Sequence, residues 1–202
     1  MNVVPIVVMP YEPREIALVG RDRVAEQSRR AREALSAAAA AVGAQLGPLT
    51  KDAEDAPIAS NGWHWSLSHA TYGVAAALGR SPIGIDIEWI RPRNQALVPR
   101  VTSRDEIELF GGFSWVSFFR VWTAKESVLK KAGCGILELS GCTLVAVPDD
   151  TTLVLRHRER DHIVRQMLRD EHIVSISHDD AAEVSTDWRW SSLAIPAANE
   201  AT

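Results

Sequence analysis

Short apolar segments in both halves of the chain predict strands. Residues 3–8 are almost wholly apolar, and residues 83–90 alternate between isoleucine and other side chains. Segments of this length that end at glycine, proline or charged residues are typical of strands. The pattern predicts extended segments at residues 3–8, 64–67, 73–78, 83–90, 143–147, 152–155 and 172–177.

Longer segments without proline predict helices between these strands. Residues 14–42 are rich in alanine, arginine and glutamate, which favour helix, and Gly43 follows them. Residues 104–110 and 117–131 also fit helices, and Gly133 lies just after the second. Residues 50–62 are polar and contain Pro57, which predicts a loop.

Two short motifs occur twice in the chain, in the same order. A-R-E-A at residues 31–34 precedes W-S-L-S-H at 65–69, and A-K-E-S at 124–127 precedes V-S-I-S-H at 174–178. A repeated helix and strand in the same order indicate an internal duplication. We therefore predict two similar lobes, formed by residues 1–100 and 101–202.

Composition restricts the class of protein. Of the 202 residues, 46% are hydrophobic and 24% are charged, which fits a folded globular chain. The net charge of −4 argues against a general nucleic-acid binder. The two cysteines, Cys134 and Cys142, fit a reducing compartment, and no apolar stretch is long enough to span a bilayer. We expect a cytoplasmic protein with no nucleic-acid or membrane partner.

The segment G-I-D-I-E at residues 84–88 places two carboxylates on one face of a predicted strand. Side chains alternate across a strand, so Asp86 and Glu88 share one face while Ile85 and Ile87 share the other. Neighbouring carboxylates repel each other and are best tolerated beside a cation, and an all-oxygen pair favours Mg²⁺. A solvated strand face explains the same pattern, so both interpretations remain open.

Two further motifs contain residue types that bind metal or phosphate. Trp122, Glu126 and Lys130 lie at i, i+4 and i+8 of a predicted helix and form one stripe. The stripe fits a charged ligand, and equally a core tryptophan beside a surface ion pair. His69 follows Ser68 at a predicted turn, where it is either a phosphate donor or an ordinary surface residue. The sequence lacks a P-loop and a G-x-S-x-G elbow, which is against a P-loop nucleotide site or a serine hydrolase.

The order of these motifs resembles that of a known family. S-x-S-H at residues 66–69, G-I-D-I-E at 84–88 and W-x-x-K-E-S-x-x-K at 122–130 are similar to the 4′-phosphopantetheinyl transferases, in particular to their two-lobed Sfp type of secondary metabolism. The specific similarity covers residues 57–135. It implies an α+β fold that is a pseudo-dimer of two similar lobes. In each lobe a small antiparallel sheet packs on a long helix.

The resemblance implies an enzyme that moves 4′-phosphopantetheine from coenzyme A to a serine of an apo acyl or peptidyl carrier protein and releases 3′,5′-ADP. It implies Mg²⁺ as the cofactor, a carrier protein or carrier domain of a polyketide, peptide or fatty-acid synthase as the partner, and a monomeric state. A non-catalytic relative that binds coenzyme A or carrier protein remains an alternative, as does a metal-dependent phosphoesterase.

Individual roles are carried over to the positions that match the family's motifs. The implied metal ligands are Asp86, Glu88 and Glu126. The implied catalytic residues are Glu106, Lys130 and Glu126. The implied coenzyme A contacts are Pro57, Ser68, His69, Trp122, Lys125 and Lys130. Basic residues for the 3′-phosphate are expected among Arg23, Arg29, Arg30 and Arg32. The chain departs from the family at Ala56, which stands before Pro57 where a cation is frequent.

Overall fold

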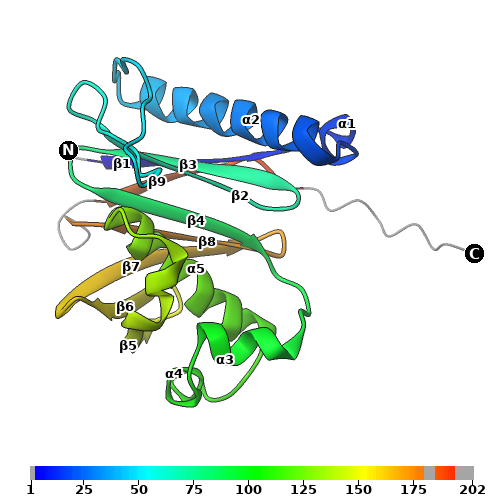
Figure 1. Cartoon of the computed structure of the whole chain (residues 1–202), viewed down its shortest axis with the longest axis vertical. Coiled ribbons are helices and arrows are strands. Elements are labelled where there is room, and N and C mark those ends of the chain that lie inside the picture. The colour runs from blue at the N-terminus through cyan, green and yellow to red at the C-terminus, as the bar shows by residue number, and fades with distance from the viewer. Residues whose placement is uncertain (1–2, 180–184, 194–202) are drawn as a thin grey trace, which may run out of the picture.

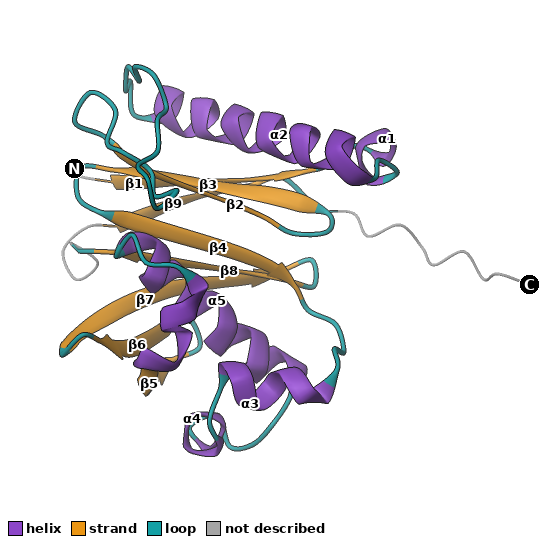
Figure 2. Ribbon diagram, viewed as in Figure 1, coloured by secondary structure: helices purple, strands orange, loops and turns teal. Residues whose placement is uncertain are grey.

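A computed structural model of the chain describes residues 3–179 and 185–193, in which two β-sheets each carry a long helix (Figures 1 and 2). The first sheet has the strand order β2-β3-β1-β9, and the second has the order β4-β8-β7-β6-β5. The strands of the first sheet are β1 (Val3–Pro10), β2 (His64–His69), β3 (Gly73–Gly79) and β9 (Ser185–Trp190). Those of the second are β4 (Ile83–Trp89), β5 (Cys142–Asp149), β6 (Thr152–His157), β7 (Arg160–Arg169) and β8 (His172–His178).

The helices divide between the two sheets. Helix α2 (Gly20–Ala41) covers the outer face of the first sheet, and α5 (Trp115–Lys131) lies against β4 and β8 of the second (Figure 1). The shorter helices are α1 (Pro13–Ile16), α3 (Val98–Val101) and α4 (Arg104–Glu108), with 3₁₀ turns η1 (Gln95–Leu97) and η2 (Ile136–Gly141). This mixture of sheets and helices confirms the expected α+β class.

Small and branched side chains explain how the layers pack. The buried face of α2 is mostly alanine, with Ala34 and Ala38 fully buried, so the helix approaches the first sheet closely. Between the two sheets, Ile85 and Ile87 of β4 pack in one apolar cluster with Ile6 of β1. The alternation of β4 therefore directs its isoleucines into the core between the sheets and leaves its polar side chains on the α5 face.

Strands from both halves of the sequence contribute to each sheet. β4 precedes residue 100 but pairs antiparallel with β8, and β9 pairs with β1 in parallel. All other named strand pairs are antiparallel. The lobe boundary at residue 100 and the internal duplication stay predictions, and the described backbone shows that the two sheets exchange strands across that boundary.

Most predicted elements are present, but one predicted helix is divided and several short elements and two strands were not predicted. The predicted helix at residues 14–42 is divided into α1 and α2, and Gly20 at the start of α2 has a φ of +58°. Strands β7 and β9 were not predicted, because their apolar residues alternate with many charged ones. None of the helices within the described ranges is long and apolar enough to cross a membrane.

Candidate active site

A cavity of about 590 Å³ lies where elements of both sheets meet. Its walls come from α2, the loop at residues 51–57, β2, β4 and α5. The charged and polar side chains that line it include Arg32, Lys51, Glu54, Asp55, Ser68, His69, Asp86, Glu88, Glu126 and Lys130. Trp122 and Pro57 also line this cavity. The structure therefore brings most of the residues singled out in the sequence to one place.

Asp86 is the buried centre of the polar wall. Its Oδ1 accepts hydrogen bonds from Lys130 Nζ at 2.7 Å and from Ser68 Oγ at 2.7 Å. Its Oδ2 is buried and has no hydrogen-bond partner among the described residues. A buried carboxylate oxygen without a partner is costly, so this atom is free to accept a ligand.

Three carboxylates, from β4 and α5, face the same cavity. Burial, followed by repulsion from Asp86, raises the pKa of Glu88 to about 7. Burial and the charge of Asp86 likewise raise the pKa of Glu126. Burial and a neighbouring negative charge both disfavour ionisation, so a bound cation would favour the ionised form of Glu88 and Glu126.

Two cationic or basic side chains stand beside these acids. Lys130 Nζ is also within hydrogen-bond distance of Ser68 Oγ and of the Ile85 carbonyl, both at 3.1 Å. His69 lines the cavity, and burial together with the Lys130 charge lowers the pKa of its imidazole. A neutral histidine next to a fixed ammonium suits a site that receives an anion.

Serine hydroxyls join the edges of the two sheets beneath the site. Ser66 Oγ accepts a hydrogen bond from the Ile85 amide at 3.0 Å, and Ser68 Oγ accepts one from the Ile87 amide at 3.3 Å. The S-x-S motif of β2 therefore holds the edge of β4 in place. The family resemblance implied a coenzyme A contact for Ser68, and no sequence pattern indicated this link between the sheets.

Comparisons with known proteins place the chain in a family. A sequence model of the 4′-phosphopantetheinyl transferase superfamily matches residues 82–185, just over half of the chain, and this range contains Asp86, Glu88, Glu126 and Lys130. The chain belongs to the 4′-phosphopantetheinyl transferase superfamily. The family resemblance predicted from the sequence is confirmed.

Several members of this superfamily are similar over shorter ranges. The chain is 36% identical over 78 residues to 4′-phosphopantetheinyl transferase psf-1 of Bacillus pumilus, covering 37% of the chain and 34% of that protein. It is 31% identical over 77 residues to the transferase ffp of Bacillus subtilis, covering 36% and 34%. It is 32% identical over 99 residues to the transferase HetI of Nostoc sp. (strain PCC 7120), covering 46% and 42%. These matches span less than half of each relative's own length.

Two residues that the transferase resemblance assigned to the site lie elsewhere. Lys125 Nζ and Glu106 Oε1 form an ion pair at 2.8 Å, with side chains only 4% and 6% exposed. Neither residue lines the cavity. Lys125 also donates to the Val101 carbonyl, and Glu106 accepts from the Leu144 amide.

The surroundings of Glu106 favour its ionised form, and its role as a general base stays a prediction. Burial alone would raise its pKa, but hydrogen bonds from Lys125, Leu144 and Ser103 outweigh burial and lower it. A carboxylate stabilised in its ionised form is a weak base. Glu106 also closes the capping box that begins α4, which gives it a structural function.

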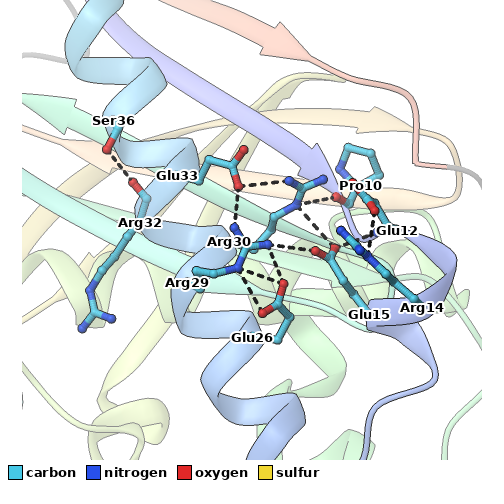
Figure 3. Close-up of polar contacts among 10 residues, drawn as sticks. All are labelled: Pro10, Glu12, Arg14, Glu15, Glu26, Arg29, Arg30, Arg32, Glu33 and Ser36. Carbon is cyan, nitrogen blue, oxygen red and sulfur yellow. Dashed lines mark hydrogen bonds and ion pairs between the residues drawn. The ribbon is translucent and has the colours of Figure 1, made fainter.

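The four arginines expected near the 3′-phosphate differ in their contacts, and Figure 3 draws three of them, Arg29, Arg30 and Arg32. Arg29 and Arg30 bind the carboxylates of Glu15 and Glu33 in an ion-pair network. Arg23 donates to backbone carbonyls. Arg32 lines the cavity, and its guanidinium has no hydrogen-bond or ion-pair partner within residues 3–179 and 185–193. In Figure 3 it points away from the network.

Proposed function

We propose that this protein transfers 4′-phosphopantetheine from coenzyme A to a serine of an apo carrier protein. The observation that carries the proposal is the cavity in which three carboxylates from β4 and α5 meet Lys130 and His69. Membership of the 4′-phosphopantetheinyl transferase superfamily supports phosphopantetheine transfer as the reaction of this cavity.

The acidic wall of the cavity fits a divalent cation. Asp86 Oδ2 is buried without a partner, and the pKa values of Glu88 and Glu126 are raised by burial and by Asp86. Oxygen-only ligands of this kind suit Mg²⁺. Lys130 Nζ donates to Asp86 Oδ1 at 2.7 Å, so Oδ2 is the Asp86 oxygen available to a metal ion. We assign Asp86, Glu88 and Glu126 as the Mg²⁺ ligands.

Basic residues elsewhere on the cavity wall fit the phosphates of coenzyme A. Arg32 offers a guanidinium without a protein partner in the described chain, and planar guanidinium groups bind phosphate in bidentate fashion. Lys51 is also on the wall, 2.8 Å from Asp55, in an exposed pair that contributes little stability and can reopen. Ala56 and Pro57 line the cavity and supply no charge there.

The reaction is a phosphoryl transfer, for which positioning and charge neutralisation are the main requirements. The carrier serine oxygen forms a bond to the β-phosphorus as the bond to 3′,5′-ADP breaks. Bound Mg²⁺ supplies charge neutralisation at the diphosphate. Lys130 Nζ would donate to the same negative charge from its place beside Asp86, and a carboxylate oxygen of Glu126, rather than of Glu106, would accept the serine proton.

A cluster of arginines after β4 supports docking of an acidic carrier protein. Arg93 Nη2 lies 4.0 Å from Glu88 Oε2, and the Arg91 guanidinium lies 4.8 Å from the centre of the Trp89 ring. These cations are next to the proposed metal strand. A carrier domain of a polyketide, peptide or fatty-acid synthase bound there would present its serine to the cavity.

One experiment tests the proposal against its alternatives. The protein is incubated with several apo carrier proteins, coenzyme A and Mg²⁺, and the intact mass of each carrier is measured. Transfer predicts a phosphopantetheine adduct on a carrier serine together with 3′,5′-ADP. A binding-only relative would retain coenzyme A without an adduct, whereas a phosphoesterase would cleave coenzyme A and leave every carrier unmodified.

A further inference from the structure

A second group of potential metal ligands lies outside the carboxylate cluster. The Sγ of Cys134, a carboxylate oxygen of Glu138 and a ring nitrogen of His157 all lie within 4.8 Å of one another. Cys134 follows the end of α5, Glu138 belongs to η2, and His157 ends β6. Neither the carboxylate site nor the proposed transfer reaction uses these three residues.

The three ligand atoms lie near enough to one another to share one ion after a small shift. Bond lengths of roughly 2.0–2.3 Å place the ligand atoms of four-coordinate Zn²⁺ roughly 3.3–3.8 Å apart. His157 Nε2 already lies 3.0 Å from Glu138 Oε2. Since no pair exceeds 4.8 Å, a shift of about 1 Å brings the thiol, the imidazole and the carboxylate within reach of one ion.

The burial of His157 favours a preformed ligand over a chance surface cluster. The His157 side chain is only 3% exposed, so its ring is held in one orientation by the surrounding protein. Cys134 is half-buried, and Glu138 remains accessible to an entering ion. Sulfur, nitrogen and oxygen donors together are typical of Zn²⁺ and are not those that Mg²⁺ prefers.

We propose that Cys134, Glu138 and His157 bind one Zn²⁺ ion, with water completing the tetrahedron. Three protein ligands and one open position are the arrangement of an exchangeable rather than a purely structural zinc site. The proposal stands independently of the transfer reaction.

Arg158 forms an ion pair with Glu138 and therefore competes with a metal ion for this carboxylate. Its Nη2 lies 2.6 Å from Glu138 Oε1, and its side chain is 62% exposed. Zn²⁺ bound to a thiolate and a carboxylate gives a neutral group, so Arg158 is no longer needed to balance Glu138 and can turn to solvent. Removal of Arg158 is therefore expected to tighten zinc binding, whereas removal of any ligand weakens it.

The position of the ion connects it to the cavity. Cys134 is one of the three proposed zinc ligands, and together with Gly133 it also lines the cavity. Zinc would tie the turn after α5 to the end of β6. It would thereby fix the part of the wall that follows the helix carrying Glu126 and Lys130.

The test uses cobalt and zinc with the metal-free protein. Co²⁺ reports its ligands directly, since a thiolate gives a near-ultraviolet charge-transfer band and four-coordination gives intense visible bands. We expect one equivalent of Co²⁺ to produce both features, Zn²⁺ to abolish them, and Zn²⁺ binding to release protons. The variants Cys134→Ser and Glu138→Gln should each weaken zinc binding by roughly tenfold or more, and Arg158→Ala should strengthen it.

Matched controls separate this site from other ligands. Cys142→Ala leaves Cys134 as the sole cysteine and should keep the cobalt–thiolate band, and Glu88→Gln alters only the carboxylate site and should also keep it. Circular dichroism verifies folding. The proposal is overturned if Cys134→Ser keeps the band, if wild-type protein shows no saturable thiolate–cobalt complex, or if Arg158→Ala weakens zinc binding.

Discussion

A Cβ atom on Gly84 would lie 2.0 Å from the carbonyl oxygen of Ser127 and 2.5 Å from the amide nitrogen of Lys131. The backbones of β4 and α5 therefore touch at Gly84. Asp86 and Glu88 lie on that strand, and Glu126 and Lys130 lie on that helix. The close approach sets the separation between the two parts of the acidic wall.

Replacing Gly84 by alanine should disturb both stability and the site. The added methyl group meets backbone on α5, which cannot move aside as a flexible side chain does, so we expect a loss of about 1–3 kcal/mol or more in the free energy of unfolding. Urea denaturation measures it. Gly141→Ala is the control, because a Cβ there meets no atom within 4 Å. Equal stability of the two variants would contradict the prediction.

Local periodicity was sufficient to predict much of the site. Asp86 and Glu88 share a strand face because side chains alternate, and Glu126 and Lys130 share a helix face because they are four residues apart. These relationships depend only on the element type, and the structure brings all four side chains to one cavity. The two long helices and the early strands were predictable for the same reason.

Contacts between distant segments could not be predicted in this way. Lys125 is next to Glu126 in the sequence, but one residue along a helix rotates the side chain by about 100° and directs it into the core. Its partner Glu106 lies 19 positions away, and only the packing of α4 on α5 brings them together. Strand β9 pairs in parallel with β1 at the other end of the chain, a contact that no local pattern specifies.

Replacing Glu126 by alanine should abolish transfer and leave the fold intact. Loss of a metal ligand from a site that neutralises charge is expected to raise the barrier by about 4 kcal/mol, or on the order of a thousandfold in rate. Without metal, the variant should be as stable as the wild type, because removing the Glu126 carboxylate also removes its repulsion from Asp86. Carrier modification is measured at saturating Mg²⁺, with the exposed Glu108→Ala as the control. Near-normal, magnesium-dependent turnover by Glu126→Ala would refute the assignment.

Replacing Arg32 by alanine should raise the KM for coenzyme A. A charge-assisted hydrogen bond is worth about 1.5–3 kcal/mol, which corresponds to roughly a 10–150-fold effect. If Arg32 binds the 3′-phosphate, the effect on dephospho-coenzyme A should be much smaller. Arg29→Ala is the matched control, since Arg29 is engaged with Glu15 and Glu26. Similar KM changes for both donors would show that Arg32 does not recognise this phosphate.

The stability of the metal-free protein should depend on Glu88. Its pKa is raised to about 7, against roughly 4.3 for an unfolded glutamate. Between these values the folded state binds more protons than the unfolded state, so the free energy of unfolding falls as pH rises through this window. Urea denaturation in EDTA should show a decline in the wild type that is smaller in Glu88→Gln. Identical slopes for the two proteins would exclude this contribution.

The buried pair of Glu106 and Lys125 allows a structural role to be separated from a catalytic one. Removing one partner leaves an uncompensated buried charge, so Lys125→Met should cost about 3–5 kcal/mol of stability. Glu106→Gln should also be destabilising, because Glu106 accepts from both Lys125 and the Leu144 amide. Replacing both, by Glu106→Leu with Lys125→Met, should recover part of the loss, since no buried charge is then unpaired.

Kinetics of the same variants decides whether Glu106 is a base. Because Glu106 lies outside the cavity wall, folded Glu106→Gln protein at low temperature should keep a kcat within about tenfold of the wild type and an unchanged pH profile. A general base would behave differently, with a large loss of kcat and the disappearance of the acidic limb of the profile. If circular dichroism shows that the variant is folded, that result would show that Glu106 acts as the general base despite its ion pair with Lys125.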